Sequence, residues 1–282
     1  MFAKIGIVGL GLIGGSLAQL IRSKHPNLPI IGLARRKETI EYARSQEIIS
    51  EGYTDLNHFP TDCDLIVICT PIHTTKDTLI EMSHHTQIAT VLTDVASIKH
   101  AVEIPKDSLK NGDLYVPGHP MAGSDQTGIE ASSVSLLQHA TYILGPSEDN
   151  RAQVLATFLE NLSCHVITLT NDLHDSLVSA ASHIPYLMAQ LTLTPGKHLN
   201  DHDKGLFKQV ISSGFFDTTR VANSDPRWGA DVCVGNKENL LVQLSQISDQ
   251  LTALIALIKE ENPETLHQHF RENQSFRQDL YS

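Results

Sequence analysis

A glycine-rich segment near the N-terminus has the spacing of a phosphate-binding loop. Gly9, Gly11 and Gly14 form the pattern G-x-G-x-x-G between a short apolar run and a helical stretch. In such a loop the first glycine permits a tight turn, the second lets the backbone approach a pyrophosphate, and the third allows close helix–strand packing. The helix offers free N–H groups to the anion, so the predicted site includes Leu12 and Ile13. The pattern predicts dinucleotide binding; the alternative is a glycine-rich turn without a ligand.

Two arginines at the end of the second predicted strand bear on which dinucleotide is bound. An NAD-binding loop usually offers Asp or Glu to the ribose hydroxyls about twenty residues beyond the glycines, whereas this sequence reads GLARR, ending in Arg35 and Arg36. Guanidinium groups suit a 2′-phosphate, so we predict NADP in preference to NAD. The alternative is an exposed basic turn that begins the next helix. Thr70, after a later apolar run, is a further predicted cofactor contact.

Two later loops carry side chains suited to acid–base chemistry. His119 lies between Gly118 and Pro120, a rigid setting that suits a positioned base. Ser97 could hydrogen-bond His119, or it could cap a short helix expected at Ile98–Glu103. Ligands of doubly wound sheets lie outside the carboxyl ends of the strands, so we expect both loops to reach the nicotinamide.

Short apolar runs alternate with helical stretches over residues 1–170. The predicted strands are Ala3–Val8, Ile30–Ala34, Leu65–Cys69, Thr90–Val95, Tyr115–Val116, Tyr142–Leu144 and His165–Leu169. The predicted helices are Ile13–Arg22, Lys37–Ser45, Thr74–Ser83, Ile98–Glu103 and Asn150–Leu162. Continuous apolar runs are typical of strands covered on both faces. The alternation predicts an α/β fold, a doubly wound Rossmann-type parallel sheet that binds the dinucleotide.

Strand signals fade after Thr170, and residues 171–282 read as an all-helical second domain. One helix is expected from Leu173 to Leu191, kinked at Pro185. From Asn236 to about Glu261 the apolar residues repeat in steps of four and three, as in a heptad seam; they are Leu240, Leu244, Ile247, Leu251, Leu254 and Ile258. The seam favours a homodimer through the C-terminal helices, with an intrachain core as the alternative. A last helix is expected within Pro263–Leu280.

The composition of the 282 residues excludes several classes of partner. The formal net charge of −11 argues against nucleic acid and acidic membranes as ligands. The first 23 residues could pass for a signal peptide, but their glycine density argues against it, and no other apolar run approaches the roughly 20 residues of a membrane span. Four scattered cysteines favour a reducing, cytoplasmic location. His198 and His202 have no third ligand nearby, so no metal site is expected.

In this order and spacing, the segments GLGLIGGSLA, DVASIK, GHPMAG, SHIPY and GFFDTTR closely resemble the prephenate/arogenate dehydrogenase family of tyrosine biosynthesis. The resemblance covers essentially the whole chain, and GHPMAG after DVASIK is its specific part. It implies NADP-dependent oxidative decarboxylation of prephenate to 4-hydroxyphenylpyruvate, or of arogenate to tyrosine. It also implies a nucleotide-binding domain followed by a helical domain that forms a homodimer. The chain leaves no room for a fused mutase or a regulatory domain, so we expect no tyrosine feedback through such a domain.

The resemblance also implies roles for individual residues. His119 matches the family's catalytic histidine, which draws the ring hydroxyl proton while ring C4 gives a hydride to the nicotinamide. Ser97 matches the serine that orients this histidine and touches the nicotinamide. Arg220 matches the arginine that binds the ring carboxylate, where a bidentate guanidinium fits. From the sequence alone, Arg220 is an ordinary helix arginine.

Three further residues are predicted to contact substrate. His183 matches a substrate-binding histidine of the family, and His174 and Trp228 are weaker candidates that by themselves read as packing residues. Pro117 and Tyr186 stand where many members have Gly and His, which leaves the choice between prephenate and arogenate open. Two rival functions remain: a hydroxyisobutyrate-like two-domain dehydrogenase, which relies on a catalytic lysine, and a non-catalytic NADP-sensing module.

Overall fold

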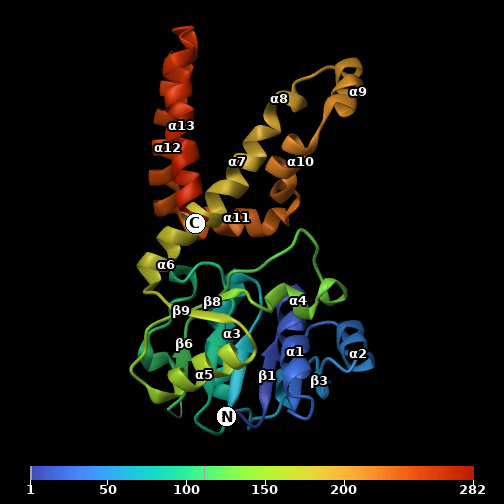
Figure 1. Cartoon of the computed structure of the whole chain (residues 1–282). Helices are drawn as coiled ribbons and strands as arrows, with labels where there is room; N and C mark the ends of the chain where they lie inside the picture. The colour runs from blue at the N-terminus through green and yellow to red at the C-terminus, as the bar shows by residue number, and fades with distance from the viewer. Residues whose placement is uncertain (1, 111) are drawn as a thin grey trace. The chain divides into compact units, whose positions relative to one another are not determined.

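A computed structural model describes residues 2–110 and 112–282, and the chain forms two compact units, Met1–Lys237 and Glu238–Ser282. Six strands of the first unit form a parallel sheet in the order β3-β2-β1-β4-β5-β6 (Figure 1). They are β1 (Ile5–Val8), β2 (Ile30–Leu33), β3 (Glu51–Tyr53), β4 (Leu65–Ile68), β5 (Val91–Asp94) and β6 (Leu114–Val116). The strand order reverses at β1, which lies between β2 and β4. In sheets of this order the dinucleotide binds at the carboxyl ends beside that point, and the predicted Rossmann-type fold is confirmed.

Apolar side chains alternate along the strands between two cores, one on each face of the sheet. Ile5 and Ile7 of β1 pack in one core with Leu17 and Leu20. Ile66 of β4 packs in the other core with Leu79 and Met82. Because both faces are covered, β1 and β4 are buried along their whole length. The helices of this part are α1 (Leu12–Lys24), α2 (Lys37–Ser45), α3 (Ile72–His85), α4 (Val134–Leu137) and α5 (Asn150–Asn161).

A smaller sheet follows the parallel one and carries the segment around His119. It has the order β7-β8-β9, with β7 (Gly118–Pro120) antiparallel and β9 (His165–Thr168) parallel to β8 (Thr141–Leu144). Two strands are absent from the sequence prediction, β3 and β7. Each spans only three residues and contains Gly or Pro, which weakens the strand signal.

Short turns of helix connect these elements. They are η1 (Leu56–His58), η2 (His100–Val102), η3 (Lys106–Ser108) and η4 (Ile129–Ala131). The helix predicted at Ile98–Glu103 is wrong, since the segment forms only the 3₁₀ turn η2. Asp175 accepts the backbone N–H groups of Lys99 and His100 at the start of this turn. The backbone is extended again at Glu103, and Pro105 restricts the residue before it to extended conformations.

The first unit continues into helices beyond the carboxyl ends of the strands (Figure 1). They are α6 (Asn171–Val178), α7 (Ile184–Thr192), α8 (Thr194–Lys197), α9 (Asp201–Val210), α10 (Ser213–Thr219), the 3₁₀ turn η6 (Arg220–Asn223) and α11 (Pro226–Gly235). The expected kink near Pro185 takes the form of a π-helical turn, η5 (Ser179–His183), directly before α7.

The second unit consists of α12 (Lys237–Lys259) and α13 (Pro263–Asp279). The predicted seam lies on α12, where Leu240 is buried while Leu251 and Ile258 are each 56% exposed. By length and composition α12 is also apolar enough to cross a membrane, with an 18-residue window of mean hydropathy 1.3. The expectation that no later stretch approaches that length is therefore wrong for α12. One such helix is weak evidence for a membrane span, because apolar helices that pack against protein pass the same test.

Candidate active site

The glycine loop joins β1 to α1 in the conformation that phosphate binding requires. Gly9 has φ +97°, and a Cβ there would lie 2.5 Å from the carbonyl oxygen of Cys69 at the end of β4. A Cβ at Gly14 would collide with the carbonyl oxygen of Gly9. A Cβ at Gly11 would meet no atom within 4 Å. Gly9 and Gly14 are therefore needed to close the turn, whereas the space at Gly11 stays open to a ligand.

The start of α1 fits an anion. Gly11 is the N-cap and supplies no capping side chain, and the first turn contains no acidic residue. The backbone N–H groups of Leu12 and Ile13, the first two helical residues, are thus available to a phosphate. Thr70, which follows β4 beside the loop, places its Oγ1 3.3 Å from Thr75 Oγ1. These residues fit the pyrophosphate of a dinucleotide.

Alanine at two of these glycines should separate folding from cofactor binding. Gly14→Ala should cost about 1–3 kcal/mol of folding free energy, because backbone atoms cannot move aside cheaply. Gly11→Ala should leave the Tm unchanged, because the position is open and its backbone is extended, yet raise the cofactor Kd by about tenfold or more. Thermal melts and cofactor titrations of both variants measure the two effects. Equal Tm losses would contradict this assignment.

Arg35 and Arg36 lie exposed between β2 and α2, and Arg36 is the N-cap of α2. Neither guanidinium pairs with a carboxylate among residues 2–110 and 112–282. The next cation, Lys37, does pair, with Glu41 at 3.3 Å on α2. The role of the two guanidiniums toward a 2′-phosphate stays a prediction.

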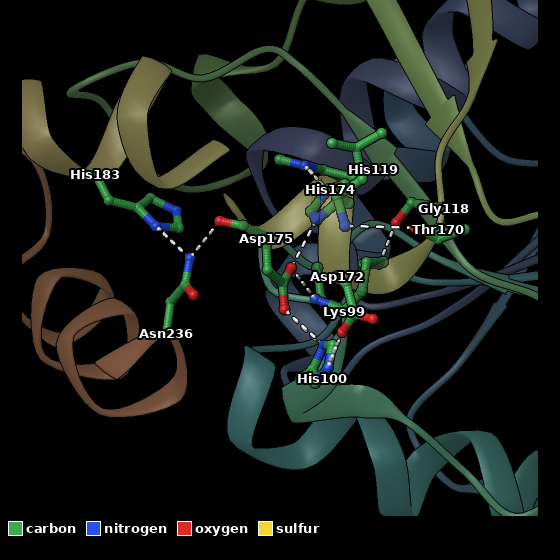
Figure 2. Close-up of polar contacts among 12 residues, drawn as sticks. Lys99, His100, Gly118, His119, Thr170, Asp172, His174, Asp175, His183 and Asn236 are labelled. Atoms are coloured by element: carbon green, nitrogen blue, oxygen red, sulfur yellow. Dashed lines mark hydrogen bonds and ion pairs between the residues drawn. The ribbon is translucent and has the colours of Figure 1, made fainter. Parts of the chain in front are cut away.

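His119 lies on β7 at the start of a chain of three buried side chains (Figure 2). Its Nδ1 is 2.8 Å from Nε2 of His174, and Nδ1 of His174 is 2.7 Å from Oδ1 of Asp175. The two later residues lie on α6, which begins where the Thr170 side chain accepts a hydrogen bond from the Leu173 N–H. Both ring nitrogens of His174 are therefore engaged within the protein, which leaves neither of them for a substrate.

The surroundings of His119 keep its ring neutral. Burial lowers the pKa of His119 well below 6.5, and the charges of Lys99, His174 and His183 lower it further. Nε2 of His119 forms no hydrogen bond with the described residues, so one ring nitrogen is free of protein partners. A neutral imidazole with a free nitrogen can accept a proton from a bound molecule.

A buried ion pair fixes the backbone on which His119 is held. Lys99 Nζ lies 2.6 Å from Asp94 Oδ1 and donates to the carbonyl oxygen of Gly118 at 2.5 Å. Asp94 also accepts the hydroxyl of Tyr115 at 2.6 Å. A Cβ at Gly118 would lie 2.5 Å from the carbonyl oxygen of Asp94, so only glycine lets β7 begin against β5.

Ser97 lies in the loop after β5, and its hydroxyl is buried without a hydrogen-bond partner among the described residues. It bonds neither to His119 nor to the backbone of η2, so neither of the two contacts expected from the sequence is present. A buried hydroxyl without a partner carries a desolvation cost, and a ligand group could satisfy it. Its role toward substrate or cofactor stays a prediction.

His183 is fully buried at the end of η5. Its Nδ1 lies 3.2 Å from Nδ2 of Asn236, while its Nε2 has no partner among the described residues. Burial is the main reason that the pKa of His183 falls to about 4. Trp228 of α11 packs edge-on against both His183 and Tyr186, with ring centroids 6.1 and 5.1 Å apart.

Arg220 is exposed at the start of η6. The pKa of Asp125 is lowered mainly by a hydrogen bond from Asn223, and the positive charge of Arg220 lowers it further. The structure records no contact between Arg220 and the chain of His119, His174 and Asp175. Its role at a substrate carboxylate stays a prediction.

Sequence reasoning missed four residues of this region. Asp94, Lys99 and Asp175 hold His119 or its backbone in place, and Asn236 contacts the ring of His183. Asp94 and Lys99 belong to the segment DVASIK, and Asp175 directly follows His174, so adjacency to flagged residues is the signal that could have found them. Among the described residues, no three His, Cys, Asp or Glu side chains are grouped to hold a metal ion.

The reversal of strand order, the open glycine turn and a neutral buried histidine beyond the strands define a nicotinamide-dinucleotide-dependent dehydrogenase. Models of the "Prephenate dehydrogenase, nucleotide-binding domain" and the "Prephenate dehydrogenase, dimerization domain" match residues 17–168 and 170–272. The chain belongs to the prephenate dehydrogenase family.

Relatives support this assignment over the whole chain. Prephenate dehydrogenase of Bacillus subtilis is 29% identical over 279 residues, which are 97% of this chain and 75% of that protein. The structure of Synechocystis arogenate dehydrogenase is similar at 32% identity and a TM-score of 0.81, over 99% of this chain and 100% of that one. A prephenate dehydrogenase of A. aeolicus in complex with hydroxyphenyl propionate and NAD+ is similar at 28% identity and a TM-score of 0.88, over 99% of both chains.

Proposed function

We propose that this protein catalyses the NADP-dependent oxidative decarboxylation of prephenate to 4-hydroxyphenylpyruvate or of arogenate to tyrosine. The observation that carries the proposal is His119, which is neutral, buried and bound through one ring nitrogen only. Both substrates have a ring hydroxyl at C4 and a carboxylate at C1. Oxidation at C4 builds a carbonyl there, and loss of CO2 from C1 makes the ring aromatic. The gain in aromaticity makes the reaction effectively irreversible.

Different residues of the chain bind the cofactor, accept the proton and orient the reacting groups. The dinucleotide, when bound at Gly9, Gly11 and Gly14, supplies the acceptor for the hydrogen that leaves C4 with its electron pair. His119 takes the C4 hydroxyl proton at Nε2. The Ser97 hydroxyl, which has no hydrogen-bond partner in the part of the chain that the structure describes, orients the reacting groups.

The substrate's ring carboxylate is assigned to Arg220, because a guanidinium can bind it with two hydrogen bonds. His183 Nε2 has no partner within residues 2–110 and 112–282, and His183 is assigned to substrate as well. Trp228 packs on that histidine and holds its ring in place. His174 takes a different role, behind His119.

At the level of the whole chain, we propose a cofactor-binding part over residues 1–170 and a helical part over residues 171–282. The heptad seam of α12, with Leu251 and Ile258 exposed, supports a homodimer through the C-terminal helices. The match to a dimerization-domain model at residues 170–272 supports the same arrangement. We propose a cytoplasmic location, in line with the four unpaired cysteines.

Steady-state kinetics with prephenate and arogenate, each with NADP and with NAD, test this function. We expect turnover of at least one substrate, with one CO2 released for each dinucleotide reduced. An inactive but folded protein with all four pairs would overturn the proposal.

Removing the two guanidiniums should abolish the preference for NADP. In Arg35→Ala/Arg36→Ala we expect KM for NADP to rise by roughly 10- to 100-fold, since charge-assisted hydrogen bonds contribute about 1.5–3 kcal/mol. KM for NAD should change less than about threefold, because NAD lacks the 2′-phosphate. Lys37→Ala is the matched control, as its ammonium already pairs with Glu41. A wild-type preference for NAD, or an unchanged ratio in the double variant, would contradict the assignment.

A further inference from the structure

His174 and Asp175 form a hydrogen-bonded chain behind His119 that ends on a carboxylate. Asp175 Oδ1 accepts the backbone N–H of Lys99 at 2.7 Å as well as His174 Nδ1. Its Oδ2 accepts the backbone N–H of His100 at 3.0 Å. The His100 ring lies 3.2 Å from the same oxygen. Every contact drawn to Asp175 in Figure 2 therefore offers it a donor or a potential donor.

These donors keep Asp175 ionised. Burial by itself raises the pKa of Asp175, but the hydrogen bonds from His174 and from the backbone N–H groups of His100 and Lys99 outweigh it and lower the pKa below its usual value. An ionised carboxylate only accepts hydrogen bonds. The ring nitrogen of His174 that faces Asp175 must therefore carry its proton.

That proton determines the tautomer of both histidines. A neutral His174 with its proton on Nδ1 has a lone pair on Nε2, so it accepts a hydrogen bond from Nδ1–H of His119. A neutral His119 with its proton on Nδ1 then has its lone pair on Nε2. We infer that His174 and Asp175 are positioning residues that fix His119 in the tautomer whose free Nε2 accepts the substrate proton. This inference rests on the proposed function of His119.

The same chain gives the accepted proton a place to go. When the C4 O–H bond breaks, its proton forms an N–H bond at His119 Nε2. The N–H bond at His119 Nδ1 can then break as its proton forms a new N–H bond at His174 Nε2, across a hydrogen bond in which the two nitrogens are 2.8 Å apart. His119 is neutral again, His174 carries a proton on each nitrogen, and no group is oxidised or reduced in this transfer. The positive charge then lies against the Asp175 carboxylate.

The charges around the two rings favour this displacement. The cation beside His119 is Lys99, which lowers the pKa of His119, and the carboxylate of Asp94 is already engaged by Lys99. His174 instead hydrogen-bonds the anionic Asp175. On the far side of Asp175, the half-exposed ring of His100 contacts the exposed Asp172 at 2.9 Å. A positive charge on His174 therefore faces a carboxylate, whereas one on His119 would lie near the ammonium of Lys99.

The tautomer of His119 can be measured directly in the full-length protein labelled with ¹⁵N-histidine. Two-bond ¹H–¹⁵N spectra distinguish protonated from unprotonated ring nitrogens, and His119→Asn identifies the His119 signals. In the wild type we expect an unprotonated Nε2 at His119. In Asp175→Asn, where the amide can donate to His174, we expect that signal to be lost or mixed with the opposite tautomer.

Kinetics on the same variant give the second readout. Asp175→Asn should lower kcat by about 10²–10⁴-fold with KM within about threefold, as expected for loss of a correctly oriented base. Asp172→Asn is the matched control: it removes a carboxylate from the same network, but one exposed at 91% of its side chain, and should keep kcat within about twofold. If Asp175→Asn does not fold, His174→Phe tests the same chain, since it removes both ring hydrogen bonds at similar volume.

Two outcomes separate this inference from the proposed function. If His119→Asn is inactive while Asp175→Asn and His174→Phe keep wild-type kcat and the His119 tautomer, the positioning role falls and the function of His119 stands. If His119→Asn retains wild-type kcat, the proposed function of His119 falls and the inference falls with it.

Discussion

Replacing His119 by asparagine should lower kcat by about 10²–10⁴-fold while the KM values for substrate and cofactor change little. General-base catalysis contributes rate enhancements of that size. The Asn amide can occupy part of the ring's volume and keep a hydrogen bond to His174, but it cannot take up a proton. The loss therefore belongs to the chemical step rather than to binding.

Initial rates over a range of substrate concentrations, at several pH values, measure this effect. Because the pKa of His119 lies well below 6.5, the base is neutral throughout the neutral range. The wild-type kcat/KM should fall only as the pH drops toward that lowered pKa. In His119→Asn this acid limb should disappear from the residual rate. A kcat within a few-fold of wild type would remove His119 from the mechanism.

Replacing Lys99 by methionine should destabilise the folded protein by about 3–5 kcal/mol. Breaking a buried ion pair from one side leaves the other charge uncompensated. Here the remaining charge would be Asp94, fully buried and 2.6 Å from the lost ammonium. For a protein of this size the Tm should fall by roughly 2–4 °C per kcal/mol. Denaturant and thermal melts measure the loss.

Two further variants make this prediction specific. Lys37→Met removes the cation of an exposed ion pair, whose side chains are 79% and 63% accessible, and should change stability by no more than about 0.5 kcal/mol. Adding Asp94→Asn to Lys99→Met should recover part of the lost stability, since the amide leaves no unpaired charge. A Lys99→Met protein as stable as the Lys37→Met control would show that the pair contributes nothing.

Most strands of the sheet can be predicted from the sequence, because a strand buried on both faces is a continuous run of apolar residues. β1 and β4 are runs of four buried apolar residues. The glycine pattern directly after β1 indicates where the chain turns into α1. The strands that were not predicted, β3 and β7, pair with strands distant in the chain. The segment Ile98–Glu103 has helical composition, but its backbone is extended again at Glu103, two residues before Pro105.

The candidate site could likewise be predicted only where neighbouring residues in the sequence carry the signal. His119 stands out because Gly118 and Pro120 flank it. His174 is part of the site, yet its role depends on a contact with His119 across 55 residues, which no local pattern records. Lys99 and Asp94 are ordinary charged residues until the fold buries them together.

The π-helical turn before α7 sets the angular phase of the helical segment that carries His174 and His183. At 3.6 residues per turn, nine positions amount to two and a half turns, so a regular α-helix would point these histidines in opposite directions. The structure buries both, and Asn236 contacts both the Asp175 backbone and the His183 ring. One residue more or less in Ser179–His183 would rotate all later side chains of the helix by about 100° around the helix axis. The π-helical turn thus lets both histidines face the protein interior.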